Sequence, residues 1–352
     1  MIYRRAIESR SRRFHGALMG NSLAVKDNII LTDAYQRQFS YLRLSITDLC
    51  NFKCSYCLPN GYQGKASQNE LSLDEIKILI ASFAELGFKK IRLTGGEPSL
   101  RKDLLEIIKV CKAQPGIEKV CITTNGYRLN HFLPQWIAAG IDQVNISIDS
   151  LSPEQFELIT ASSDLPMIIG ALHQAIDNGF NAIKINTVLL REHIDSQVMP
   201  LINWVKDKPI ALRFIELMQT GENKEFFNRQ HLPADKIKLL LANQGWNEKS
   251  RLIHSGPAIE YDHPNHMGSV GIIAPYSKNF CDTCNRLRVT AQGQLHLCLF
   301  SEDGKDLRPF LQTGDAAQLT EFLSTSIYDK LPKHYLQQQQ TGATRNFAML
   351  GG

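Results

Sequence analysis

The stretch LRLSITDLCNFKCSYC, residues 42–57, joins a strand pattern to a run of cysteines. Apolar and polar residues alternate over residues 42–47, which predicts a short β-strand. The cysteines that follow, Cys50, Cys54 and Cys57, have the spacing C-x3-C-x2-C. Three closely spaced thiolates can hold a 4Fe-4S cluster and leave its fourth iron without a protein ligand. The stretch therefore predicts a strand that leads into an iron–sulfur site with one open coordination position.

A second set of three cysteines, Cys281, Cys284 and Cys298, follows much later with the spacing C-x2-C-x13-C. It again leaves one iron open, so we expect two 4Fe-4S clusters. Zinc is the alternative for either set, but it would need a fourth Cys or His nearby, and the first histidine after Cys57 is His131. A disulfide framework is disfavoured in a chain long enough to build its own core.

The composition is that of an ordinary globular protein. The chain has 352 residues, of which 43% are hydrophobic and 21% are charged. Its net charge of +4 is too small to indicate a nucleic-acid partner. No apolar run approaches the roughly 20 residues that a membrane-spanning helix needs. We therefore expect a cytoplasmic protein that binds neither nucleic acid nor membrane.

Strand and helix patterns alternate after residue 41. A capping box, Ser72 to Glu75, opens one predicted helix, and helical stretches separate all the later strands. The further strand patterns lie at residues 90–94, 119–124, 143–148, 182–189 and 211–216. Six parallel strands are too few for a closed eight-stranded barrel. The predicted fold class is α/β, an incomplete (β/α)6 TIM-type barrel, with a C-terminal region that carries the second iron–sulfur cluster.

The chain divides into four predicted parts. Residues 1–30 are arginine-rich and are expected to form a disordered basic extension without a catalytic role. Residues 31–217 form the partial barrel, residues 218–340 the C-terminal cluster-binding region, and residues 341–352 a tail that ends in Gly351 and Gly352. Cys111 and Cys121, which belong to neither triad, lie in apolar patterns and are expected to be core residues.

Two glycines follow the second predicted strand, at the edge of the barrel where ligands bind. Gly95 and Gly96, in the run TGGEP, let the backbone approach a ligand closely. Together with C-x3-C-x2-C this run resembles the radical S-adenosylmethionine (SAM) superfamily. That resemblance implies that the methionyl amine and carboxylate of SAM bind the open iron, and it assigns to SAM the residues Tyr56, Gly96, Ser147 and Met218.

Basic residues recur inside the predicted strands. Strand alternation can direct Arg43, Arg92, Lys184 and Arg213 into the barrel, where unpaired charges would be costly without an anion. Arg286 and Arg288, two residues apart beside the second triad, can share one side of an extended segment. These cations predict a substrate with several negative charges.

Several segments of the chain are similar to segments of radical SAM cyclases that act on GTP at the start of molybdenum cofactor synthesis, and they occur in the same order. The similar segments include YLRLSITDLCNFKCSYCLP (41–59), IRLTGGEPSLRKDL (91–104) and FCDTCNRLRVT (280–290). The similarity assigns to GTP the residues Arg43, Lys90, Arg92, Thr123, Lys184, Arg213, Arg286, Leu287 and Arg288. It also implies that the tail with Gly351 and Gly352 enters the active site and takes part in the reaction.

The resemblance implies a radical cyclisation. An electron from an external one-electron donor cleaves SAM to methionine and a 5'-deoxyadenosyl radical, which takes hydrogen from C3' of the GTP ribose. The carbon radical then attacks C8 of guanine, and a further electron and a proton complete the product. A homodimer and a hand-off to cyclic pyranopterin monophosphate synthase are also implied.

Two other iron–sulfur functions are open at this point, and a third alternative, a zinc-dependent nucleic-acid-binding module, is disfavoured by the small net charge and the missing fourth ligands. A radical SAM enzyme that acts on a peptide would share the two triads, although such enzymes generally have more cysteines in their auxiliary domains. A two-cluster electron carrier would share the clusters, but it would leave the TGGEP run and the six strand–helix units unexplained.

Overall fold

A computed structural model describes residues 30–64, 69–250 and 256–351. Six parallel strands form its centre, and each pairs with the next along the chain. They are β1 (Tyr41–Ser45), β2 (Lys90–Thr94), β3 (Lys119–Thr124), β4 (Gln143–Ser147), β5 (Ile183–Leu189) and β6 (Ile210–Glu216). This confirms the predicted partial barrel, with strand ends that differ from the predicted ones by a residue or two.

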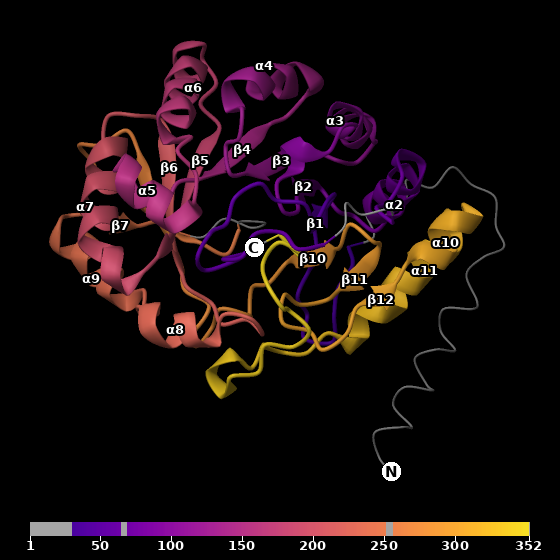
Figure 1. Ribbon diagram of the computed structural model, residues 1–352. Helices are drawn as coiled ribbons and strands as arrows, with labels where there is room; N and C mark the ends of the chain where they lie inside the picture. The colour runs from indigo at the N-terminus through magenta and orange to yellow at the C-terminus, as the bar shows by residue number, and fades with distance from the viewer. Residues whose placement is uncertain (1–29, 65–68, 251–255, 352) are drawn as a thin grey trace.

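Helices connect these strands and cover their outer face (Figure 1). They are α2 (Leu73–Glu85), α3 (Leu104–Ala113), α4 (Leu129–Ala139), α5 (Pro153–Thr160), α6 (Leu165–Asp177) and α7 (Ile194–Val205). The capping box of α2 is present: the Glu75 backbone N–H donates to Ser72 Oγ at 3.2 Å, and the Ser72 N–H donates to Glu75 Oε2 at 2.8 Å. Ile76, Leu79 and Phe83 of this helix are fully buried against the sheet and its neighbours.

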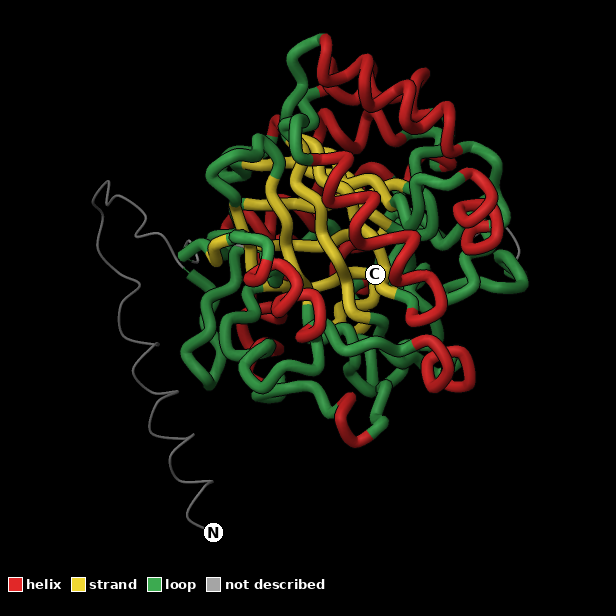
Figure 2. The backbone as a smooth tube through the Cα atoms, turned by 90° about the vertical axis from the view of Figure 1, so that its left-hand side faces the viewer, coloured by secondary structure: helices red, strands yellow, loops and turns green. Residues whose placement is uncertain are grey.

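The sheet extends beyond the six predicted strands at both ends. β9 (Ser269–Ile273) pairs in parallel with β6, and β10 (Arg286–Val289) pairs in parallel with β1. The outer strands are antiparallel: β8 (Ile259–Asp262) and β7 (Asn247–Glu248) beyond β9, and β11 (Gln294–His296) and β12 (Lys305–Asp306) beyond β10. The described strands thus form one open twelve-stranded sheet, which Figure 2 shows curving through the molecule.

The C-terminal part of the chain completes the two sides of this sheet. Its helices are α8 (Lys224–Gln230), α9 (Asp235–Asn243), α10 (Arg308–Thr313) and α11 (Ala316–Ser326). Helices α10 and α11 pack against α2 on the outside, whereas the final segment turns inward, to the centre of the arc of strands (Figure 1). The tail therefore lies where the inner faces of the strands converge.

The two faces of the central strands differ in chemistry. Leu42 and Leu44 of β1 are buried in the hydrophobic core under the helices, whereas Arg43 between them lines a cavity on the inner face. Cys111, in α3, is a fully buried core residue, as predicted. Cys121, in β3, is also fully buried, but its neighbours Val120 and Ile122 join the helix-side core and it does not.

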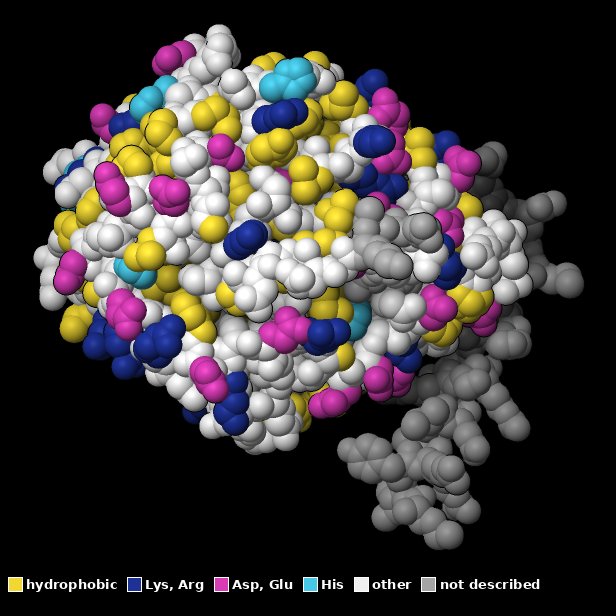
Figure 3. Space-filling model, in the orientation of Figure 1, with side chains coloured by type: hydrophobic (Ala, Val, Ile, Leu, Met, Phe, Trp, Pro, Cys, Tyr) yellow, Lys and Arg dark blue, Asp and Glu magenta, His cyan; other side chains and the backbone are white. Residues whose placement is uncertain are grey.

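The exterior carries mixed charge. Figure 3 shows lysines, arginines and acidic residues interspersed over the face seen in Figure 1. None of the helices in the described part of the chain is long and apolar enough to cross a membrane. The predicted basic extension lies outside the described residues except for Ile30, as does Gly352.

Candidate active site

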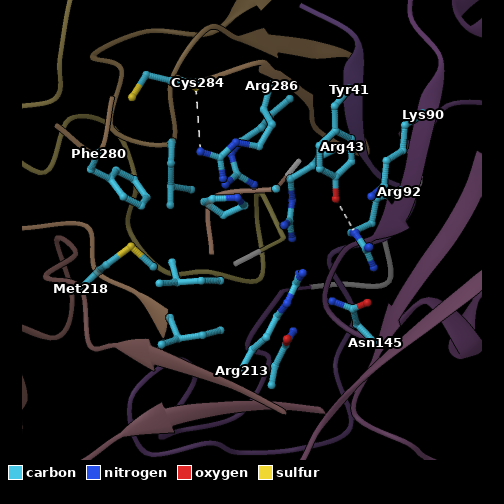
Figure 4. Close-up of a pocket in the computed structure, with 18 of the residues that line it drawn as sticks. Tyr41, Arg43, Lys90, Arg92, Asn145, Arg213, Met218, Phe280, Cys284 and Arg286 are labelled. Carbon is cyan, nitrogen blue, oxygen red and sulfur yellow. Dashed lines mark hydrogen bonds between the residues drawn. The ribbon is translucent and has the colours of Figure 1, made fainter. Parts of the chain in front are cut away.

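The inner face of the sheet encloses a cavity of about 360 Å³. Alternate residues of the strands line it, because successive side chains of a strand point to opposite faces. Its cationic lining residues come from six strands and are Arg43, Lys90, Arg92, Lys119, Lys184, Arg213, Arg286 and Arg288. Figure 4 shows Arg43, Arg92, Arg213 and Arg286 directed toward a common space. So many like charges around one cavity favour an anionic ligand.

Tyr41 lies among these cations. Arg92 donates from Nε to the Tyr41 hydroxyl and from Nη1 to Thr123 Oγ1 at 3.1 Å, and Lys90 Nζ lies 4.7 Å from the centre of the Tyr41 ring. Burial alone would raise the pKa of Tyr41, but Arg92, Lys90 and Arg43 lower it to about 7. The cavity is therefore positive enough to stabilise a phenolate, and by the same physics a phosphate.

One carboxylate lines the cavity among the described residues, and it belongs to Glu260 of β8. Arg213 Nη2 donates to Glu260 Oε1 at 2.6 Å, and Lys184 Nζ lies 3.6 Å from the same oxygen. Burial and Arg213 lower the pKa of Lys184 to about 8, while Glu260 acts in the opposite direction. Glu260 is thus the counter-ion of two cations that the sequence assigned to the substrate.

The C-terminal tail reaches the same cavity. Arg43 Nη2 donates to the carbonyl oxygen of Gly351 at 2.6 Å, and Arg288 Nη1 donates to the carbonyl oxygens of Leu350 and Gly351 at 3.0 and 2.8 Å. Gly351 has a φ of +61°, and a Cβ on it would lie 2.2 Å from Thr94 Cγ2. Only glycine fits at this position.

The second cysteine triad lies at one side of this cavity. Cys281, Cys284 and Cys298 all line it, and Arg286 Nη2 lies 4.0 Å from Cys284 Sγ (Figure 4). Burial would raise the pKa of Cys284, but Lys330 and Arg286 lower it to about 6. Three thiols directed at one cavity, one of them favouring its thiolate, are a suitable donor set for a cluster.

The first triad lines a second, smaller pocket of about 140 Å³. Cys50, Cys54 and Cys57 face it together with Gly95 and Gly96. Burial raises the pKa of Cys50 to about 11 and that of Cys57 to about 12, so these thiols ionise readily only when a cation such as iron joins them. This donor set also fits a cluster. No three His, Cys, Asp or Glu side chains in the described ranges are grouped as ligands of a single metal ion.

Two buried carboxylates join the segments around the first triad. The Tyr56 hydroxyl donates to Asp149 Oδ2 at 2.9 Å, which joins the loop to the residues after β4. Glu97 is fully buried and accepts hydrogen bonds from Thr124 Oγ1 at 2.8 Å and from the Asn125 N–H at 2.7 Å, which joins β2 to β3. No role for the carboxylates of Glu97 and Asp149 was predicted from the sequence.

The residues assigned to SAM all line the smaller pocket: Tyr56, Gly96, Ser147 and Met218. Those assigned to GTP line the larger cavity, with two exceptions. Thr123 lines the smaller pocket and accepts from Arg92, and the Leu287 side chain is buried in the hydrophobic core on the other face of β10. The two spaces share Asn186, Ile215 and Met218 in their linings, so they are neighbours.

Sequence reasoning missed Tyr41, Lys119 and Glu260. Tyr41 and Lys119 stand at strand positions of the same parity as Arg43 and Thr123, so alternation could have found them. Glu260 had no such signal, because the pairing that brings β8 to the cavity joins segments outside the predicted barrel.

Family models match nearly the whole described chain. The model for the radical SAM superfamily matches residues 44–205, and that for Molybdenum Cofactor Synthesis C matches residues 210–336. The chain is 47% identical over 336 residues to a protein of Psychromonas ingrahamii named GTP 3',8-cyclase, with 95% of this chain and 98% of that protein covered. It is 51% identical over 323 residues to a Stenotrophomonas maltophilia protein of the same name, with 92% and 99% covered.

A solved structure shares the fold. Streptococcus suis SuiB bound to S-adenosylmethionine superimposes with a TM-score of 0.54 at 12% identity, over 83% of this chain and 69% of that one. This similarity concerns the architecture alone, and it agrees with the open barrel. Since the cysteine triads and the inward cations stand in a chain so similar to these relatives over nearly its full length, the protein belongs to the GTP 3',8-cyclase family of the radical SAM superfamily.

Proposed function

We propose that this chain uses SAM to convert GTP to (8S)-3',8-cyclo-7,8-dihydroguanosine 5'-triphosphate, the first step of molybdopterin biosynthesis. The names of the relatives support this lyase activity. The observation that carries it is the larger cavity, where eight cationic side chains and three cysteines face one space beside a second cysteine pocket. That arrangement suits a polyanion with a base at one end.

The cationic side of the cavity holds the triphosphate. Guanidinium groups bind phosphate oxygens in a bidentate manner, and lysines act as point charges. Arg92 and Arg288 are buried in the strand layer and Arg43 is half-buried, and hydrogen bonds to Thr123 and to the tail hold their guanidinium groups in place before the nucleotide arrives. Such preorganised charges orient the ribose toward the smaller pocket.

Two 4Fe-4S clusters are the cofactors that we propose, one on Cys50, Cys54 and Cys57 and one on Cys281, Cys284 and Cys298. When bound, they would pass on the donor's electron for reductive cleavage of SAM and offer an open iron to the guanine ring. The protein's own residues do the positioning: Tyr56, Gly96, Ser147 and Met218 surround SAM in the smaller pocket. Met218 lines both spaces, so SAM and GTP would meet beside its side chain.

The tail closes the site from within. Gly351 accepts hydrogen bonds from Arg43 and Arg288, which line the larger cavity. It also lies against Thr94, which lines the smaller pocket. It excludes water from the space where carbon radicals must survive. Overall, one electron enters with SAM cleavage, a hydrogen atom leaves C3' as 5'-deoxyadenosine forms, the C3'–C8 bond closes, and a second electron with a proton completes the product.

Several partners belong to this proposal. They are an external one-electron donor, a second copy of the chain in a homodimer, and cyclic pyranopterin monophosphate synthase as the recipient of the product, all in the cytoplasm. Membership of the chain in its family supports these three partners.

Turnover of deuterated GTP tests the proposal. The reconstituted protein is given SAM, dithionite and GTP deuterated at C3' without oxygen, and released 5'-deoxyadenosine is analysed by mass spectrometry. We expect deuterium in that product together with a cyclised guanine nucleotide. SAM cleavage without deuterium transfer would keep the radical chemistry and overturn GTP as the substrate.

A further inference from the structure

Glu260 stands at a position where a substrate phosphate would be expected to bind. Its Oε1 accepts from Arg213 Nη2 at 2.6 Å and lies 3.6 Å from Lys184 Nζ. Both cations line the larger cavity from adjacent strands. Lys184 of β5 is in register with Ala211, and Arg213 of β6 is in register with Asn186. Two cations that converge on one carboxylate oxygen would bind a phosphate oxygen in the same way.

The two sides of this ion pair differ in exposure. The side chain of Arg213 is 9% exposed and that of Lys184 is 22% exposed, whereas that of Glu260 is 40% exposed. The cations are therefore the more buried partners, and the carboxylate is the one with the most access to water. The anion is thus the partner that can leave the contact for water most easily.

Charge balance also separates Glu260 from the rest of the lining. Eight cationic residues surround the cavity, and Glu260 supplies the only carboxylate among its described lining residues. A bound triphosphate would bring like charge beside Glu260, and like charges in a poorly solvated site repel strongly. Glu260 and the phosphate therefore cannot share Arg213 and Lys184 without a large electrostatic cost.

We infer that Glu260 is an internal competitor for the substrate: it occupies Arg213 and Lys184 in the empty protein, and a phosphate of the nucleotide displaces it. This inference rests on the proposed function and adds a residue that sets affinity for the phosphate chain. Glu260 weakens binding of phosphate-bearing ligands and has little effect on a ligand without phosphates.

The test measures binding to the reconstituted protein and its Glu260→Gln variant by anaerobic calorimetry. Glutamine keeps the shape and one acceptor oxygen but removes the charge. We expect the dissociation constants for GTP and for inorganic tripolyphosphate to fall by about tenfold, since one like-charge contact is removed, and that for guanosine to stay unchanged. Unchanged or weaker binding of tripolyphosphate would overturn the inference, and so would an equal gain for guanosine.

Glu248→Gln is the matched control. Glu248 lies on the neighbouring strand β7, opposite Tyr261, and is outside the cavity lining. The change removes the same charge from the same sheet edge, so the gain for tripolyphosphate must be absent from this variant. The test is also separate from the proposed activity: failure of the unaltered protein to cyclise GTP would overturn the function, whereas tripolyphosphate binding reports on Glu260 in either case.

Discussion

At the scale of single residues, the cavity is described best by the groups that its charges perturb. Tyr41 is the clearest case, because burial opposes ionisation and three cations overcome it. A phenol with a pKa of about 7 reports the potential at the place where phosphate is expected. It therefore allows the charge of the empty cavity to be measured without a ligand.

The ionisation of Tyr41 predicts a pH dependence of stability. Its pKa in the folded protein, about 7, is below its ordinary value of 10.0, so the unfolded chain binds more protons between these values. The unfolding free energy should therefore gain a contribution as pH rises from about 7 to about 10, and lose it again as pH falls. Urea denaturation of the unaltered protein and of Tyr41→Phe at several pH values checks this. A difference between the two that does not grow with pH would contradict the assignment.

Gly96 predicts a steric effect at the SAM pocket. A Cβ at this position would lie 2.1 Å from the carbonyl oxygen of Leu49, a backbone atom that cannot rotate away. Gly96→Ala should therefore lower the unfolding free energy by about 1–3 kcal/mol and disturb the loop of the first triad. Gly170→Ala is the control, because nothing lies within 4 Å of its Cβ position in α6, and it should be neutral or stabilising. Equal losses in urea denaturation would contradict the steric explanation.

At the scale of elements, the strands of the partial barrel were predictable and their outer neighbours were not. Local alternation marks β1 to β6, and helices of ordinary length between them force parallel pairing. β9 and β10 lie outside the regular strand–helix repeat, and their pairing with β6 and β1 depends on long-range contacts that no local pattern encodes. The cysteines and most cations of the site were predictable because they lie on the regular strands or in spaced motifs. Glu260 was not, because it enters the cavity through β8.

The tail is the element whose removal should separate two steps of the reaction. A chain that ends at Leu350 loses the Gly351 carbonyl that accepts from Arg43 and Arg288, but it keeps the packing of Phe347 and Leu350. We expect it to bind iron normally and to lose cyclisation of GTP. Iron and sulfide content, 5'-deoxyadenosine release and cyclised nucleotide are the three measurements. Undiminished cyclisation would show that the last two glycines take no part.

At the scale of the whole molecule, one buried arginine, Arg37, is paired with Asp33 and joins the start of the described chain to its C-terminal part. Arg37 Nε lies 2.6 Å from Asp33 Oδ2, and the side chains of Arg37 and Asp33 are 5% and 0% exposed. Arg37 also donates to the carbonyl oxygens of Leu331 at 2.7 Å, Pro332 at 2.8 Å and Cys281 at 3.3 Å. The loop of the second triad is thus tied to a segment that precedes β1.

Arg37→Met should be strongly destabilising because it leaves the Asp33 carboxylate buried without its partner. The expected loss of unfolding free energy is about 3–5 kcal/mol, measured by urea denaturation. The double variant Arg37→Met with Asp33→Asn removes the unpaired charge, so it should recover part of that loss. A double variant no more stable than the single one would show that the lost hydrogen bonds to the C-terminal segment dominate.

The position of β1 between β2 and β10 has a consequence in time. Tyr41 pairs with Arg286, and at about 5–20 residues per second roughly ten to fifty seconds of translation separate the two. Throughout that interval the side of β1 that later pairs with β10 is an unpaired sheet edge, and the cysteines that follow β1 are already on the nascent chain. A cell that makes this protein therefore has a defined period in which those thiols must be protected or must receive their cluster before β10 has been made.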